Sequence, residues 1–387
     1  MMEGANTRSK RFTKPLAMLV GVAALLFVFN LITNHVFVSQ RNLTMLLKQS
    51  SVLMILASSL MMLLISRNID LSGGAGVYLT GTVVATLVVK AGWSIYPAIA
   101  VGVSLGVVMG MVNGFFIGFM GLPAFIVTLA AQQVFRGVGY VMTNAATVGP
   151  MPKSFNAISE AYISPTLSVV VVCLLFAFFA FINFRSFKRM GAWYGGKDRL
   201  FKNLALAAVV CGALIWVFAG YRGIPMAVVA AFAVATVMHV VSTKTVYGRH
   251  IFLIGGNIEA ARLAGVRTER RIFQAYLVEG LMYGIGGVVL TARLGGAAAT
   301  GGTGLELDAV AAACIGGTSM SGGIGSTVGV GMGVVLLTMI DNVMSLMNVS
   351  SYLQMVAKGI ILLTAVCLDL YVNKAKFKFK LVNKPKK

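Results

Sequence analysis

Seven charged side chains lie within or at the ends of long apolar segments, where an ionised group is costly unless it faces a partner or water. They are Asp70, Arg136, Glu279, Asp308, Asp341, Lys358 and Asp369. Such residues can form ion pairs inside a helical bundle or line a polar path through the membrane. Near the expected helix ends they favour capping, and deeper in the membrane they favour internal ion pairs. The first candidates for a polar path are Asp70, Arg136, Glu279, Asp308 and Lys358.

Catalytic and phosphate-binding motifs are absent from the sequence. The chain lacks the G-x-x-x-x-G-K-[ST] phosphate loop, H-E-x-x-H, G-x-S-x-G and Cys-x-x-Cys. The stretch GGTSMSGGIGS at 316–326 contains no lysine and is better interpreted as a break between helices. The four cysteines lie in apolar segments without metal-ligand spacing. We therefore expect no enzymatic activity, cofactor or metal ion in this chain.

A short polar segment, IGGNIEAARLAGV at residues 254–266, separates two membrane-length apolar segments. Its glutamate and alanines favour a helix, and Gly265 occupies a plausible C-terminal position. We interpret this 254–266 segment as a short helix outside the membrane. From residue types alone, two interpretations remain open: a helix that docks into a groove of a peripheral protein, and an amphipathic helix that lies on lipid.

The composition determines which elements position these residues. Of 387 residues, 58% are hydrophobic and 11% are charged, whereas a soluble domain carries roughly 25% charged residues. Apolar segments near the length that crosses a bilayer, about 20 residues, recur along the chain. The sequence thus predicts an all-α, polytopic transmembrane helical bundle. The expected spans are about 16–38, 50–66, 73–91, 96–118, 122–143, 165–185, 201–220, 224–243, 272–293, 306–320, 324–342 and 352–372, of which 306–320 is short, glycine-rich and a candidate half-crossing segment, which leaves about 10–12 spans.

The basic residues indicate the orientation. With the N-terminus inside, 24 of the 32 Lys and Arg residues fall on the inner side and six on the outer side. Both termini and the loop at about 244–271 are then cytoplasmic. We expect a basic N-terminal tail at 1–15, one membrane domain at 16–372 and a basic C-terminal tail at 373–387. Because the charges flank apolar spans, the net charge of +21 indicates topology and anionic lipid rather than nucleic acid.

Glycines recur at every fourth residue of the span at 96–118: Gly102, Gly106, Gly110, Gly114 and Gly118. Small residues at this spacing let helices approach closely in lipid, where hydrophobicity does not drive association. They predict close packing of this span in a compact bundle.

The 254–266 segment and its surroundings, YGRHIFLIGGNIEAARLAGV, resemble the cytoplasmic loop of ribose- and xylose-type sugar permeases, the bacterial membrane subunits of ATP-binding-cassette (ABC) importers. Four more segments match that family in the same order: RNIDLSGGAGVYLTG (67–81), GLPAFIVTLAAQQVFRG (121–137), LDAVAAACIGGTSMSGGIGS (307–326) and VSSYLQMVAKGIILLTAVCLD (349–369). The resemblance covers nearly the whole chain. Its length resembles the xylose and multiple-monosaccharide branch.

The resemblance implies a type II ABC importer-like permease in the bacterial inner membrane. It implies a second permease copy, with a homodimer as the default, an extracytoplasmic sugar-binding protein and a cytoplasmic ATPase that carries ATP and Mg. The substrate would be a monosaccharide of the xylose, ribose, galactose or glucose class. The 254–266 segment would be the coupling helix, and the 144–164 loop a weaker candidate for binding-protein contact. The coupling residues would be Gly255, Gly256, Asn257, Glu259, Ala261, Arg262 and Gly265.

Two other functions remain open. The same fold could carry a nucleoside or another small polar solute, again with an ATPase and a binding protein. A self-sufficient secondary transporter or channel would need neither partner. The absent phosphate loop and the docking-type helix favour the importer.

Overall fold

The computed structural model describes residues 24–190 and 196–382, and most of them are helical. A helix at 24–32 precedes the named elements. The α-helices are α2 (Gln40–Ile65), α3 (Gly73–Ala85), α4 (Ile95–Gly114), α5 (Ala124–Thr143), α6 (Lys153–Glu160), α7 (Pro165–Met190), α8 (Gly196–Ala219), α9 (Met226–Lys244), α10 (Val246–Gly256), α11 (Ile258–Leu263), α12 (Thr268–Leu294), α13 (Leu305–Ile315), α14 (Thr327–Leu346) and α15 (Ser351–Val382). Two single π-helical turns, η1 (Thr86–Lys90) and η2 (Phe115–Phe119), extend α3 and α4.

Nine helices within the described residues are long and apolar enough to cross a membrane, as expected for a polytopic bundle. They correspond to nine of the twelve expected spans. Helix α2 begins ten residues before the expected start at 50. Hydropathy detects only the apolar part of a helix, and the first residues of α2 are polar. The expected span at 352–372 lies inside α15. The expected span at 16–38 and the two tails fall partly outside the described residues.

The tenth expected span, 306–320, contains an 11-residue helix, α13, which is too short to cross a bilayer alone. Irregular segments on either side of α13 are hydrogen-bonded to other parts of the unit. Before α13, Met151 N donates to Gly295 O and Val148 pairs with Ala297, at the end of α12. After α13, Gly323 N donates to Ile65 O at the end of α2. Helix α13 itself lies inside the protein, since Ala309–Cys314 are buried.

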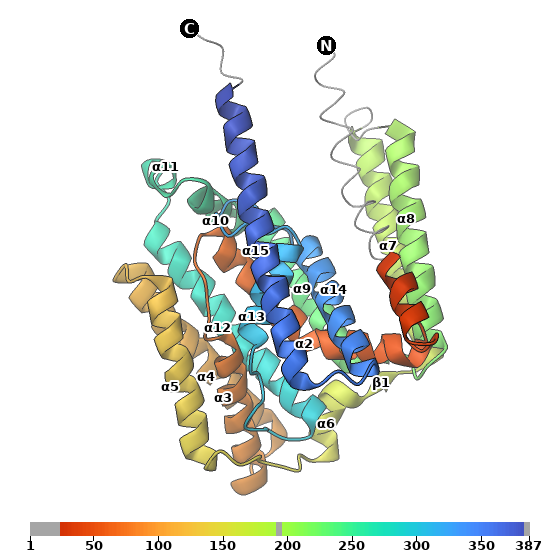
Figure 1. Cartoon of the computed structure of the whole chain (residues 1–387), viewed down its shortest axis with the longest axis vertical. Helices are drawn as coiled ribbons and strands as arrows, with labels where there is room; N and C mark the ends of the chain where they lie inside the picture. Colours follow the sequence, from red (N-terminus) through yellow and green to blue (C-terminus); the bar gives the residue numbers. More distant parts are fainter. Residues whose placement is uncertain (1–23, 191–195, 383–387) are drawn as a thin grey trace. The chain divides into compact units, whose positions relative to one another are not determined.

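The chain folds into two compact units. The first consists of the described parts of residues 1–47, 162–225 and 339–349. Helices α7 and α8 form its helical hairpin (Figure 1), in which Asn203 donates to Asn183. The two-stranded ribbon of β1 (Tyr162–Ile163) and β2 (Ile224–Pro225) is a small addition to the expected all-α fold. Pro165 begins α7, and Gly223, with φ of 97°, lies in the turn between α8 and β2.

The second unit, residues 48–161, 226–338 and 350–387, contains the main hydrophobic core. Helix α12 packs against α3 and α4, and α3 also packs against α5, as Figure 1 shows. Helix α13 packs against α15 in the same unit. The loop at 144–164 contains α6, whose Phe155 is fully buried beside α12.

The glycine stripe lies where α4 meets α12. A Cβ atom at Gly106 would lie 2.4 Å from the carbonyl oxygen of Gly280, and one at Gly110 would lie 2.3 Å from that of Tyr276. Gly114 and Gly118 also face α12, whereas Gly102 faces α3. The two backbones therefore touch without intervening side chains, which is how small residues hold helices together in lipid.

Candidate functional site

The cytoplasmic loop predicted at 244–271 contains two helices, not one. Thr245 begins α10 as its N-cap, since its hydroxyl accepts from Gly248 N at 3.0 Å. Helix α10 ends at Gly256, and Asn257 then begins α11 by accepting from Ala260 N at 3.1 Å. Gly255 and Gly256 therefore belong to the preceding helix. The extended backbone of Asn257 separates the two helices. The segment at 254–266, expected to be a single helix, therefore consists of the end of α10 followed by α11.

The C-terminus of α11 is held by a Schellman motif. Gly265 has the left-handed conformation, with φ of 78°, and its N–H donates to Arg262 O. Val266 N donates to Ala261 O. Val266, Ala261 and Ile254 pack together beneath the helix. The expected role of Gly265 as a helix-ending residue agrees with this geometry, and the small apolar cluster holds α11 in one orientation.

The guanidinium group of Arg262 is bound within the chain. It donates to Thr268 at 3.1 Å and pairs with Glu259 at 3.3 Å and with Glu269 at 3.0 Å. Because these pairs are half-exposed, each contributes at most about 1 kcal/mol to stability. Their main effect is to fasten α11 to the beginning of α12. Arg262 thus has a positioning role, in addition to any contact with a partner.

Some of the expected contact residues are buried and others are exposed. Gly255 is buried and Ala261 is only 3% exposed, so neither presents a surface to a partner. This corrects their assignment: both pack inside the chain. Gly256, Asn257, Glu259, Arg262 and Gly265 are exposed.

Leu263 was missed by the sequence interpretation, although it is 91% exposed at the end of α11. A leucine among charged residues on a short polar helix was the available signal.

The end of α2, the residue Arg67 after it and the glycine-rich stretch 316–326 all lie against the C-terminal end of α10. Arg67 donates to Gly255 O at 2.8 Å and to Gly256 O at 3.1 Å, which satisfies carbonyls at the C-terminus of α10. Gly255 lies so close to the end of α2 that a Cβ atom would be 1.6 Å from Ile65 O. Gly322 packs against Arg67. The glycine-rich stretch 316–326 therefore packs against the C-terminal end of α10. It separates α13 from α14, in agreement with its interpretation as a helix break.

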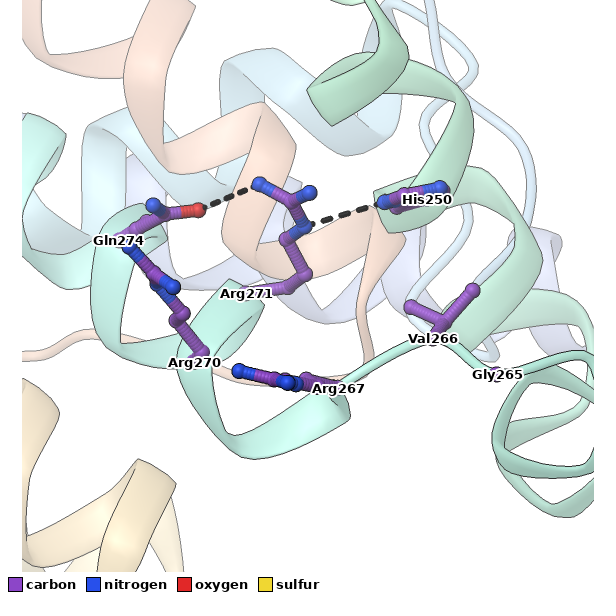
Figure 2. A pocket seen from close by; sticks show the side chains of 7 residues that line it. All are labelled: His250, Gly265, Val266, Arg267, Arg270, Arg271 and Gln274. Atoms are coloured by element: carbon purple, nitrogen blue, oxygen red, sulfur yellow. Dashed lines mark hydrogen bonds between the residues drawn. The ribbon is translucent and has the colours of Figure 1, made fainter.

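Residue His250 of α10 faces the beginning of α12. Its Nδ1 accepts from Arg271 Nε at 3.0 Å, and Arg271 also donates to Gln274 at 2.8 Å, as Figure 2 shows. Partial burial, together with the charges of Arg271 and Arg249, lowers the pKa of His250 below its usual value. The neutral imidazole is the form that accepts this hydrogen bond.

Asp70 is buried and fully engaged at the beginning of α3. One carboxylate oxygen accepts from Ser72 N at 2.7 Å and from the Ser72 hydroxyl at 2.6 Å, and the other accepts from Tyr283. Asn113 donates to the Ser72 hydroxyl at 3.0 Å. The network joins α3, α4 and α12. Asp70 forms an Asx-type turn just before α3, since it accepts from the N–H of the residue two positions later, and the expected capping of the helix by a side chain is not observed.

Glu279 has no basic partner within the described residues. It is 1% exposed, and its Oε2 atom is buried without a hydrogen-bond partner. Its Oε1 atom lies beside Gly73 at the start of α3. The expected internal ion pair is therefore absent at Glu279.

The other candidate charges are held by different partners. Lys358 of α15 pairs with Asp308 of α13 at 2.8 Å, which is the internal ion pair that its depth suggested. Arg136 donates to Gly301 O at 2.7 Å and lies 4.7 Å from the centre of the Tyr78 ring. Gln132, one turn before Arg136, donates to Glu306 at 2.9 Å. Of the five path candidates, the structure pairs Lys358 with Asp308, whereas Asp70, Glu279 and Arg136 form no ion pair with one another.

The sequence can now be compared with known proteins. A model of the family described as "branched-chain amino acid transport system / permease component" matches residues 42–366. The chain belongs to this permease family. The permease is 36% identical to the xylose transport system permease protein of Escherichia coli (strain K12) over 357 residues, which cover 91% of this chain and 90% of that protein.

Other relatives of the permease are similar over comparable lengths. The ribose import permease protein of Bacillus subtilis (strain 168) is 31% identical and covers 87% of each chain. The galactose/methyl galactoside import permease protein of Escherichia coli (strain K12) is 30% identical over a region that covers 86% of this chain and 87% of that protein. No solved structure matches. The permease is accordingly a transport subunit and a multi-pass protein of the inner membrane.

Proposed function

We propose that this permease is the membrane-spanning subunit of an ABC importer for a monosaccharide. The observation that carries the proposal is its similarity, over 91% of the chain, to a permease named for xylose, together with relatives named for allose, ribose and galactose. The substrate would pass from an extracytoplasmic binding protein to the cytoplasm by alternating access. Sugars of the xylose, ribose, galactose and glucose class are the first candidates.

The energy would come from a separate ATPase, which would hold ATP and Mg, so that this chain needs no cofactor. Two copies of the permease would form the pathway, with two ATPase copies on the cytoplasmic side. The loop at 144–164, with α6, is our candidate for contact with the binding protein.

Helix α11 would be the element that the ATPase moves. Leu263 is exposed at the C-terminal end of α11, one turn after the exposed Glu259, and Asn257 is exposed at the other end. An exposed apolar side chain surrounded by polar groups is suited to a small pocket in a partner. This supports docking over a position on lipid, because the apolar residues Ile254, Ala261 and Val266 point into the chain and not outward.

A displacement of α11 would be transmitted to the membrane-spanning helices through the contacts that α10 and α12 make. Arg262 ties α11 to α12 through Thr268 and Glu269. Arg67 ties α10 to the loop between α2 and α3. Through these contacts, displacement of α11 would act on α12 and on the segment before α3, and α12 and α3 are two of the helices joined by the buried Asp70 network.

The test is uptake of labelled xylose, ribose, glucose and galactose into proteoliposomes that contain the permease, its ATPase and the binding protein. Labelled leucine is a necessary comparison, because the family description names branched-chain amino acids. We expect sugar uptake that needs ATP and all three proteins. Leucine or nucleoside uptake without sugar uptake would contradict the substrate class. Gradient-driven uptake by the permease alone would contradict the importer.

A further inference from the structure

Beside the 254–266 segment, α10 and the beginning of α12 enclose a basic pocket of about 360 Å³. Its lining residues are His250, Gly265, Val266, Arg267, Arg270, Arg271 and Gln274. We refer to it as the arginine pocket. Its volume lies in the range of small-ligand sites, about 300–1,000 Å³. It contains three guanidinium groups and no carboxylate.

The charges of this pocket are not neutralised by the chain. The ion pairs found within residues 24–190 and 196–382 involve other basic side chains, namely Lys48, Arg262 and Lys358. Glu269, the nearest acid in sequence, is occupied by Arg262 and Thr268. Arg267, Arg270 and Arg271 therefore form no ion pair within the described chain. Placing three positive charges together is unfavourable unless an anion joins them.

The hydrogen-bond geometry prepares the pocket for an oxyanion. Arg271 is held between His250 and Gln274, which uses its Nε and Nη1 atoms and orients its remaining donors (Figure 2). Arg267 and Arg270 flank the N-terminus of α12, a helix of 27 residues whose dipole adds to the positive potential. Gly265 lines the pocket without a side chain, which leaves its wall open.

From these observations we propose that the arginine pocket binds a phosphate group carried by a larger molecule. A phosphate offers oxygens in several directions and accepts from more than one guanidinium group, whereas a carboxylate is satisfied by a single bidentate arginine. The volume exceeds what a bare ion fills, so the ligand is a phosphate ester. It comes either from an anionic lipid headgroup, since the pocket lies where a membrane-spanning helix begins, or from a soluble phosphate ester of the cytoplasm.

Two binding measurements on the full-length permease distinguish the sources. In a phosphate-free maltoside detergent, native mass spectrometry with added phosphatidylglycerol reports headgroup binding. In the same detergent, isothermal titration with glycerol 3-phosphate reports a soluble ester. Binding in only the first measurement assigns a lipid, and binding in the second assigns a soluble ligand. Neither measurement depends on transport, so failure here leaves the importer proposal untouched.

The variant Arg270→Gln removes one exposed guanidinium group that forms no ion pair among the described residues. We expect it to weaken phosphate binding about tenfold, the value of one charge-assisted hydrogen bond. The matched control is Lys153→Gln, which removes an exposed positive charge from α6 that does not line the pocket; its affinity should remain within about twofold of the unmodified chain.

Three results would overturn the proposal: no binding in either measurement, equal loss in both variants, or equal competition by acetate at the same ionic strength. Equal melting temperatures of the two variants exclude unfolding as the cause of a difference.

Discussion

Individual side chains of the 254–266 segment divide into those that hold the segment and those that face outward. Asn257, Gly265, Ala261 and Arg262 have defined roles within the chain as cap, helix end, packing residue and fastening. Leu263 has none, and its side chain is almost completely exposed. In a chain whose other exposed apolar residues can face lipid, a leucine on a polar loop indicates a protein contact.

The variant Leu263→Ala tests this contact. We expect ATP-dependent uptake to fall at least about fivefold, because truncating an interface anchor costs more than about 1 kcal/mol of binding. The melting temperature should not change, since the side chain contacts little of its own chain. Truncation of the exposed neighbour Ala264 to glycine is the control. Full uptake by Leu263→Ala would remove this residue from the interface.

A charge reversal tests the fastening role of Arg262. We expect Arg262→Glu to abolish uptake without preventing membrane insertion, because it places a third carboxylate beside Glu259 and Glu269 and releases α11 from α12. Reversing both partners, as Arg262→Glu with Glu269→Arg, restores one of the two ion pairs and should recover part of the uptake. No recovery in the double variant would indicate that Arg262 acts by touching the partner directly.

The hydrogen bond between Arg271 and His250 predicts a pH dependence of stability. The pKa of His250 is lowered in the folded chain, so the unfolded chain takes up its proton first as the pH falls. The stabilising contribution is therefore complete above the unfolded pKa of about 6.5 and is lost as the pH falls through the lower folded value. Melting temperatures between pH 8 and pH 5 should fall less steeply for His250→Gln. Parallel curves for the two proteins would contradict the assignment.

At the scale of elements, the contact between α4 and α12 is made by backbone atoms. Glycines from both helices meet there: Gly106 and Gly110 of α4 face Gly280 and Gly284 of α12. In lipid, such contact depends on shape and not on hydrophobic burial. The same principle applies to Gly255 against the end of α2, where a glycine permits an otherwise impossible approach.

The variants Gly110→Ala and Gly137→Ala form a matched pair. A Cβ atom at Gly110 would lie 2.3 Å from Tyr276 O, whereas one at Gly137 of α5 would meet no atom within 4 Å. We expect Gly110→Ala to destabilise the fold by about 1–3 kcal/mol through overpacking, and Gly137→Ala to be neutral or slightly stabilising because alanine favours helices. Thermal unfolding in detergent measures both. Equal melting temperatures would mean that the α4–α12 contact is not limiting.

At the scale of the whole molecule, the distribution of basic residues predicts which ends of the helices face the cytoplasm. The same orientation places α11 and the arginine pocket on the ATPase side and α6 on the binding-protein side. The proposed importer requires this arrangement, because its two partners occupy opposite faces of the membrane.

Single cysteines introduced at two exposed positions test the orientation. A membrane-impermeant maleimide added to intact cells should label Ser154→Cys on α6 and should leave Ala264→Cys after α11 unlabelled until the cells are opened. The four native cysteines, replaced by serine or alanine, do not then contribute. The reverse pattern would invert the topology and contradict the docking role of α11.

The sequence alone determined the class of protein, most of its spans and its family. Apolar segments of membrane length are a local property of the chain, and lipid requires each of them to form a helix. The positions of the caps and helix-ending glycines are local as well, since Asn257 and Gly265 act on neighbouring backbone atoms. Basic clusters beside the spans indicated orientation for the same reason.

Only the tertiary structure decided which charges meet. Lys358 pairs with Asp308, 50 residues away, while Glu279 has no basic partner within residues 24–190 and 196–382 and Arg136 binds a backbone carbonyl. Likewise, Arg67 contacts α10, nearly 190 residues later in the chain, and Glu269 pairs with Arg262 rather than with an arginine of the pocket. Contacts between distant residues depend on how the helices pack, and packing in lipid depends on shape, which spacing along the sequence records only in part.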